Sequence, residues 1–202
     1  MSLFDILFPP RADGLALRGL SDDDFLSLLQ VRLVSGTRPG TVVLLPFHAV
    51  PVRAAIHEAK YHGSGRAIQL LALALAEYLG SANDDFRRPA IVPIPLGELR
   101  RKERGFNQAE EVARQAVKHL SGFTVETSIL KRTRETVSQV SLPRHKREEN
   151  MRGAFSASPD LDPARTYIVV DDVLTTGATL QAAIDALQAA GAVHIVPIAL
   201  AH

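Results

Sequence analysis

The sequence predicts an α/β fold: a mainly parallel sheet flanked by helices, with a short irregular N-terminal segment. From residue 90 onward, short continuous apolar runs alternate with helical patterns. Such runs indicate strands that are covered on both faces, as in a parallel sheet between helices. Hydrophobic residues make up 46% of the 202 positions, which is enough for the core of one globular domain.

The first fifty residues form the N-terminal segment and are rich in turn-forming residues. Residues 35–40 read Ser-Gly-Thr-Arg-Pro-Gly, which is typical of a turn. Ser21, followed by three aspartates, predicts the N-cap of a short helix, and the β-branched run at 41–47 predicts a strand. We expect residues 1–50 to be distinct from a domain formed by residues 51–202.

The later elements follow one another with clear helical or strand patterns. Gly63 separates two helical patterns, and the second is apolar around most of its circumference, which predicts burial. Helices are expected at residues 52–61, 65–79, 107–120 and 178–190, and strands at 90–95, 125–130, 167–170 and 193–200. Ligands bind beyond the carboxyl ends of the strands in such sheets, so the residues after each strand are the first candidates for chemistry.

Composition excludes several classes of protein. The formal charge is +1, which argues against wholesale nucleic-acid binding but leaves room for a local basic patch. The absence of cysteine excludes disulfides and thiolate sites. No secretory signal is recognised, and the longest apolar stretch is shorter than the roughly 20 residues needed to span a bilayer. A cytoplasmic protein without membrane insertion is therefore expected.

Residues 167–180 carry the strongest functional signal: an apolar strand, two adjacent aspartates, a Thr/Gly turn and a helix. A turn that leads into a helix presents unpaired backbone N–H groups, and small residues let a phosphate approach them. The carboxylates of Asp171 and Asp172 do not favour a second phosphate, but they accept hydrogen bonds from sugar hydroxyls. A ribose phosphate is the predicted ligand. The alternative is an acidic strand end before an ordinary capped helix.

This segment resembles the phosphoribosyl pyrophosphate signature of the type I phosphoribosyltransferases, and the resemblance implies a fold of that type. It also implies that Asp171 and Asp172 hold the ribose hydroxyls. The 5′-phosphate would be bound by Thr175, Thr176, Gly177, Ala178 and Thr179, and Val173 and Leu174 are further substrate-binding candidates. Mg²⁺ is expected with phosphoribosyl pyrophosphate, and because Mg²⁺ relies largely on substrate oxygens, no protein side chain is assigned as its ligand.

A second segment narrows the resemblance to the ComF and GntX branch of that superfamily. Residues 92–95 (Val-Pro-Ile-Pro) are followed by residues 104–108 (Arg-Gly-Phe-Asn-Gln). Further agreement comes from residues 60–63, Gln139, residues 147–155 and residues 200–202, so the resemblance extends from about residue 51 to the end. Several separated motifs in the right order are more specific than any single one.

The same resemblance implies that Lys102, Arg104 and Gly105 lie beside the pyrophosphate. A pyrophosphate carries several negative charges and requires cationic partners. Arg104 is therefore a candidate catalytic residue together with Asp171 and Asp172. Without the neighbouring signature, the basic run would be interpreted as a solvated turn.

The polar run 132–152 is long for a loop in a compact domain, and loops of this length are usually functional or disordered. The resemblance implies a flexible loop that closes over the substrate. Its candidate contacts are Arg132, Arg134, Gln139, Arg144 and Arg147. A disordered insertion and a nucleic-acid contact surface are the alternatives.

The sequence departs from the ComF pattern in one respect. Proteins of that branch commonly begin with a four-cysteine zinc ribbon, and this chain has no cysteine, so no zinc is expected. Residues 1–50 stand in the place of the ribbon and are the candidate for a substrate hood. The seven histidines show no convincing metal-ligand spacing, and structural or surface roles are expected for them.

Three functions stay open from the sequence. The first is transfer of the phosphoribosyl group to an unidentified acceptor. The second is a non-catalytic role in sensing phosphoribosyl pyrophosphate or a nucleotide. The third, implied by the ComF resemblance, is an accessory role in competence and DNA uptake, with single-stranded DNA or a competence protein as partner. A homodimer is a further expectation from the family.

Overall fold

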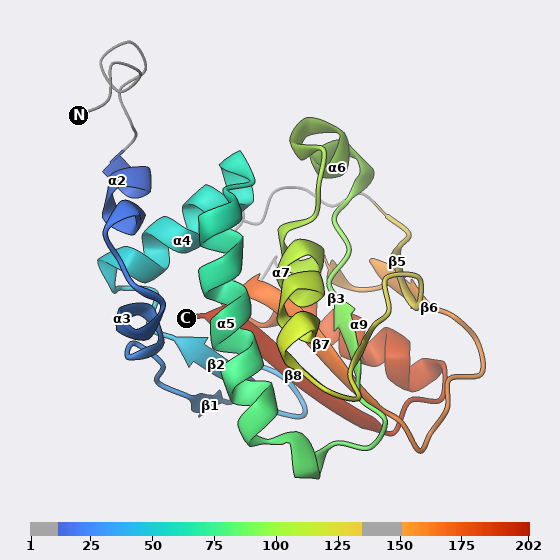
Figure 1. Ribbon diagram of the computed structural model, residues 1–202. Coiled ribbons are helices and arrows are strands. Elements are labelled where there is room, and N and C mark those ends of the chain that lie inside the picture. Colours follow the sequence, from blue (N-terminus) through green and yellow to red (C-terminus); the bar gives the residue numbers. More distant parts are fainter. Residues whose placement is uncertain (1–11, 135–150) are drawn as a thin grey trace.

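The computed structural model describes residues 12–134 and 151–202, and it shows a main sheet with several helices on one face and one helix with a small second sheet on the other (Figure 1). The main sheet has six strands in the order β1-β2-β8-β7-β3-β4. Only β1 (Arg32–Val34) and β2 (Thr41–Leu45) pair antiparallel; every other neighbouring pair in this sheet is parallel. The expected α/β class and its mainly parallel sheet are confirmed.

The central strands are buried on both faces, as their continuous apolar runs predict. They are β3 (Ala90–Pro93), β7 (Thr166–Val173) and β8 (His194–Ala201). Alternate residues of β7 enter two different cores, because successive side chains of a strand point to opposite faces. Ile168 packs with the helices on one face, and Val169 packs on the other.

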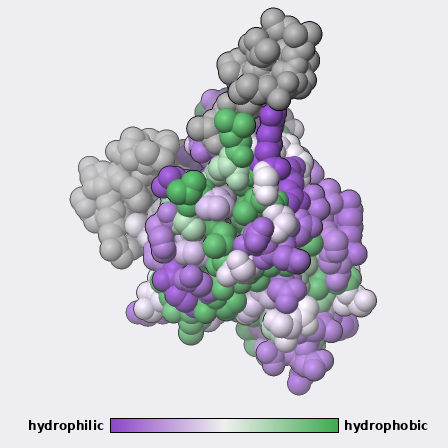
Figure 2. All heavy atoms as spheres, turned by 60° about the vertical axis from the view of Figure 1, so that its left-hand side comes forward, coloured by the Kyte–Doolittle hydropathy of each residue, from purple (hydrophilic) through white to green (hydrophobic). Residues whose placement is uncertain are grey.

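One face of the sheet is covered by most of the helices. These are α4 (Val50–His62), α5 (Gly65–Ser81) and α7 (Gln108–Ala116), with the short helices α2 (Ala12–Arg18) and α3 (Asp22–Leu26) packed beside them (Figure 1). Figure 2 turns the molecule so that the side with α2, α3 and α4 comes forward, and hydrophobic and hydrophilic residues are interspersed on it. Helix α5 supplies the largest share of the buried apolar side chains, in agreement with its apolar circumference.

The opposite face is covered by α9 (Ala178–Ala189) and a small hairpin-like sheet of β5 (Leu130–Arg132) and β6 (Phe155–Ala157). The expected single strand at 125–130 is wrong. Residues there divide between β4 (Thr124–Val125), which pairs with β3, and β5, which pairs antiparallel with β6. The polar residues 126–128 lie between the two strands and carry the chain from one sheet to the other.

The N-terminal segment contributes to the main sheet. β2 lies between β1 and β8, so the sheet continues across the expected boundary at residue 50. Ser21 caps α3 by accepting a hydrogen bond from the backbone N–H of Asp24, as predicted. Short 3-10 helices complete the described elements at η1 (Asn83–Asp85) and η2 (Val117–His119). Within the described ranges no helix is long and apolar enough to cross a membrane.

Candidate functional site

The two aspartates lie at the carboxyl end of β7, the strand between β8 and β3 in the sheet. β7 continues through both residues to Val173, three residues beyond the expected end of the strand. The backbone N–H of Ile94, just after β3, donates to the carbonyl of Val170, which joins the two strand ends. Asp171 and Asp172 both line a cavity of about 350 Å³ at this end of the strand.

Asp172 is held by two residues from the helical layer. The Lys60 Nζ atom at the end of α4 lies 2.8 Å from Asp172 Oδ2, and the Gln108 side chain at the start of α7 donates to the same oxygen at 2.6 Å. The Asp172 side chain is largely buried, so these partners replace its lost hydration. Sequence reasoning placed Lys60 and Gln108 in motifs but did not assign them to the site.

Asp171 faces a less favourable environment. Desolvation raises its pKa to about 7, and repulsion from Asp172 acts in the same direction. The backbone N–H of Asp172 donates to Asp171 Oδ1 at 2.9 Å, and this bond, Lys60 and Arg132 act in the opposite direction. Asp171 therefore holds its proton up to neutral pH, and a cation or hydroxyl donors would favour its ionised form.

The turn after β7 leads directly into a helix. Gly177 adopts φ +80° and directly precedes α9, and the turn surrounds a water-sized recess of about 10 Å³. A Cβ at Gly177 would lie 2.5 Å from the carbonyl oxygen of Gly36, in the loop after β1. The N-terminal segment therefore supports this turn by close backbone packing. Thr175 and Thr179 line the main cavity.

The basic run after β3 forms a short helix, α6 (Glu98–Arg104), which ends at Gly105 with φ +78°. Arg100 and Arg104 line the cavity, whereas Lys102 and Gly105 are exposed and lie outside its lining. Arg104 Nη1 donates to the side-chain oxygen of Gln108 at 3.1 Å. Its guanidinium also lies 5.2 Å from the ring centre of Tyr61, a cation–π contact that orients it.

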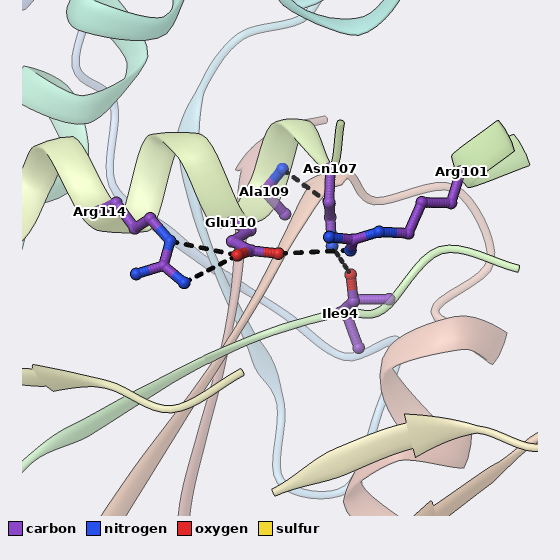
Figure 3. Close-up of polar contacts among 6 residues, drawn as sticks. All are labelled: Ile94, Arg101, Asn107, Ala109, Glu110 and Arg114. Carbon is purple, nitrogen blue, oxygen red and sulfur yellow. Dashed lines mark hydrogen bonds and ion pairs between the residues drawn. The ribbon is translucent and has the colours of Figure 1, made fainter. Parts of the chain in front are cut away.

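Polar contacts link α7 to the end of β3 and to α6 (Figure 3). The Asn107 side chain donates to the carbonyl of Ile94 at 3.0 Å and accepts a backbone N–H from the first turn of α7. Glu110 then pairs with Arg101 of α6 at 3.5 Å and with Arg114 at 2.9 Å. Asn107 is thus an N-cap that also ties α7 to the end of β3.

The polar run after β5 is described only at its two ends. Arg132 lines the cavity and lies over the ring of Phe155 at 5.5 Å. Arg134 Nη2 donates to the carbonyl of Arg152 at 2.9 Å. The other candidate contacts in this run, Gln139, Arg144 and Arg147, lie outside the described residues.

The cavity brings together two carboxylates, three guanidinium groups and the threonines of a helix-initiating turn. A cavity that holds both cations and carboxylates suits a ligand that carries both anionic groups and hydroxyls. Comparison with known proteins agrees with this chemistry: residues 66–201 match the model of the phosphoribosyl transferase domain. The chain belongs to the phosphoribosyltransferase family.

A known relative places it more narrowly. The chain is 39% identical over 93 residues to competence protein F of Haemophilus influenzae. The aligned part covers 45% of this chain and 40% of the relative, so less than half of the length of that protein is matched. Together the two findings confirm the expected ComF-like position within the family.

Proposed function

We propose that this protein binds phosphoribosyl pyrophosphate together with Mg²⁺ and transfers the phosphoribosyl group to an acceptor. The observation that carries the proposal is the Asp171–Asp172 pair, which shares one cavity with Arg100, Arg104 and Arg132 beside the turn before α9. In the proposed complex the carboxylates accept hydrogen bonds from the ribose hydroxyls, and the turn binds the 5′-phosphate.

The pyrophosphate would lie beside the arginines that line the cavity. Arg104 is held by Tyr61 and Gln108, so its charge is in place before substrate arrives. Preorganised positive charge stabilises a leaving group that becomes more negative in the transition state. The family resemblance also implied Lys102 and Gly105 as pyrophosphate contacts, but both lie outside the lining of the cavity.

The donor set of the site fits Mg²⁺. The Asp171 and Asp172 carboxylates offer oxygen ligands, the type that this ion prefers, and the remainder come from substrate and water. Bound there, the ion would neutralise the pyrophosphate charge. Lys60 and Gln108 hold Asp172 in place. The side chains of the protein would therefore orient the sugar through Asp172 and stabilise the leaving group through the arginines.

Calorimetric titration of phosphoribosyl pyrophosphate, with and without Mg²⁺, tests the binding. We expect saturable, metal-dependent binding in the native chain and its loss in Asp171→Asn/Asp172→Asn. The matched control is Asp84→Asn/Asp85→Asn, two adjacent exposed aspartates in η1, which should bind like the native chain. No binding to the folded native protein would contradict the proposal. Pyrophosphate release with a panel of bases separates transfer from ligand sensing without turnover.

A second candidate is an accessory role in DNA uptake with single-stranded DNA as ligand. It is favoured by the cationic helix α6 and by the name of the relative, competence protein F. Neutralising Arg100, Arg101, Lys102 and Arg104 together should weaken binding and reduce its salt dependence. The control neutralises four exposed cations on other elements: Arg32, Arg53, Arg87 and Lys118. Equal loss in both variants, or no binding at low salt, would count against this role.

A further inference from the structure

Three metal-ligating side chains gather at the end of α4, outside the phosphoribosyl cavity. They are His57, Glu58 and His62, and one ligand atom from each lies within 4.8 Å of the others. Glu58 and His62 are one helical turn apart and so share a face of α4. The cavity is lined by Lys60 and Tyr61 from the same turn, but by none of these three residues.

A carboxylate from another helix orients one of the imidazoles. His57 Nδ1 lies 3.0 Å from Asp13 Oδ2 on α2. When Nδ1–H donates to a carboxylate, the tautomer is fixed and Nε2 carries the free lone pair. A carboxylate behind a histidine is also the usual second shell of a histidine-bound metal ion.

The burial of the three side chains suits a site that is open to solvent on one side. Glu58 is 7% exposed, whereas both histidines are exposed. The His57 ring contacts the rings of Tyr61 at 4.8 Å and His62 at 5.8 Å, measured between centroids. The two imidazoles are therefore already adjacent, and the carboxylate near them belongs to a buried residue.

We propose that His57, Glu58 and His62 form a binding site for Zn²⁺. Two imidazoles and one carboxylate are typical zinc ligands and leave one tetrahedral position for water. With bonds of about 2.1 Å, ligand atoms around the ion lie about 3.4 Å apart, which small rotations of the exposed imidazoles would reach. Imidazole nitrogens favour zinc over Mg²⁺, so this site and the substrate site would take different ions.

This assignment differs from the expectation that the chain takes no zinc and that its histidines have only structural or surface roles. The sequence did not indicate this site, because the spacing of His57, Glu58 and His62 matches no common zinc motif. The site joins α2, through Asp13, to the turn of α4 that carries Lys60. An ion bound there would stabilise the turn that presents Lys60 to Asp172.

Calorimetric titration of the full chain with Zn²⁺ at pH 7.5 tests the site. We expect one ion per chain, with affinity at least tenfold lower in His57→Ala and in His62→Ala. Both residues are exposed, so the variants should fold, which circular dichroism verifies. His119→Ala, an exposed histidine in η2, is the matched control and should keep the native affinity.

Two results would overturn the proposal. One is native zinc affinity in both His57→Ala and His62→Ala. The other is loss of zinc binding in Asp171→Asn/Asp172→Asn, which would place the ion in the substrate site. Retention of zinc binding in that double variant, in the presence of excess Mg²⁺, supports a separate site. This outcome does not depend on whether the chain binds phosphoribosyl pyrophosphate.

Discussion

Replacement of Asp171 by asparagine should make the folded protein more stable while it impairs the proposed substrate site. The raised pKa of Asp171 means that its ionised form is disfavoured in the folded chain, mainly through desolvation and then through repulsion from Asp172. Between pH 4 and pH 7 the folded protein retains a proton that the unfolded chain releases. The contribution of this group to stability therefore falls as pH rises through this range and levels off above it.

The size of the effect follows from the change in pKa. A rise from 3.8 to about 7 corresponds to about 4 kcal/mol, since each tenfold change in an equilibrium is worth about 1.4 kcal/mol. Asp171 is partly exposed, so solvent screens part of this penalty, and we expect a gain of about 1 to 3 kcal/mol at pH 8. Asparagine can still accept the backbone hydrogen bond from Asp172, so that contact is retained.

Urea denaturation of the native chain and of Asp171→Asn at pH 8 and pH 5 measures this gain. At pH 5 the native aspartate is already protonated in the folded state, so the gain should shrink to under half of its value at pH 8. Asp84→Asn, at an exposed position, should show no such pH-dependent gain. Lower stability of Asp171→Asn at pH 8, or an equal gain at both pH values, would refute the reasoning.

Three further outcomes are expected. Gly177→Ala should destabilise the fold by about 3 kcal/mol in urea denaturation. Gly122→Ala, with a similar positive φ but open space around it, should destabilise the fold by only about 1 kcal/mol. Equal losses of stability would contradict the role of close packing at Gly177. Asn107→Ala should lose about 2 kcal/mol, because a helix cap and a buried carbonyl lose their partner; a thermal melt unchanged from the native chain would exclude this. Lys60→Met should raise the pKa of Asp171 further, because the lysine charge lowers that pKa. Titrations across a pH series should then show half-maximal binding of phosphoribosyl pyrophosphate at a higher pH. An unchanged pH dependence of binding would show that the charge of Lys60 does not affect the Asp171 carboxyl.

Local chemistry made much of the fold predictable. The helices around Gly63 and the buried strand before Asp171 lie close to their expected positions, because apolar periodicity and turn residues act over a few neighbouring positions. The strand at 125–130 was not predictable in the same way. Its residues divide between two sheets, and that choice depends on partner strands far along the chain.

The candidate site also combines residues that the sequence indicates with residues that only the tertiary structure brings together. Asp171, Asp172 and the turn to Thr179 form one continuous segment whose chemistry can be interpreted without a structure. Lys60 and Gln108 come from other helices and meet Asp172 only because α4 and α7 pack on the same face of the sheet. The spacing of these residues along the sequence does not predict their contact.

The amino-acid sequence by itself determined the class of fold, the segment for which we propose ribose phosphate binding, and membership of a ComF-like family. These properties depend on residue type and short-range order, which set the periods of strands and helices and the chemistry of a turn. Only the tertiary structure decided which cations reach the aspartates, how Gly36 supports the turn at Gly177, and that His57 and His62 lie beside Glu58. Those features depend on the packing of distant segments, because burial and charge act through space and not along the chain.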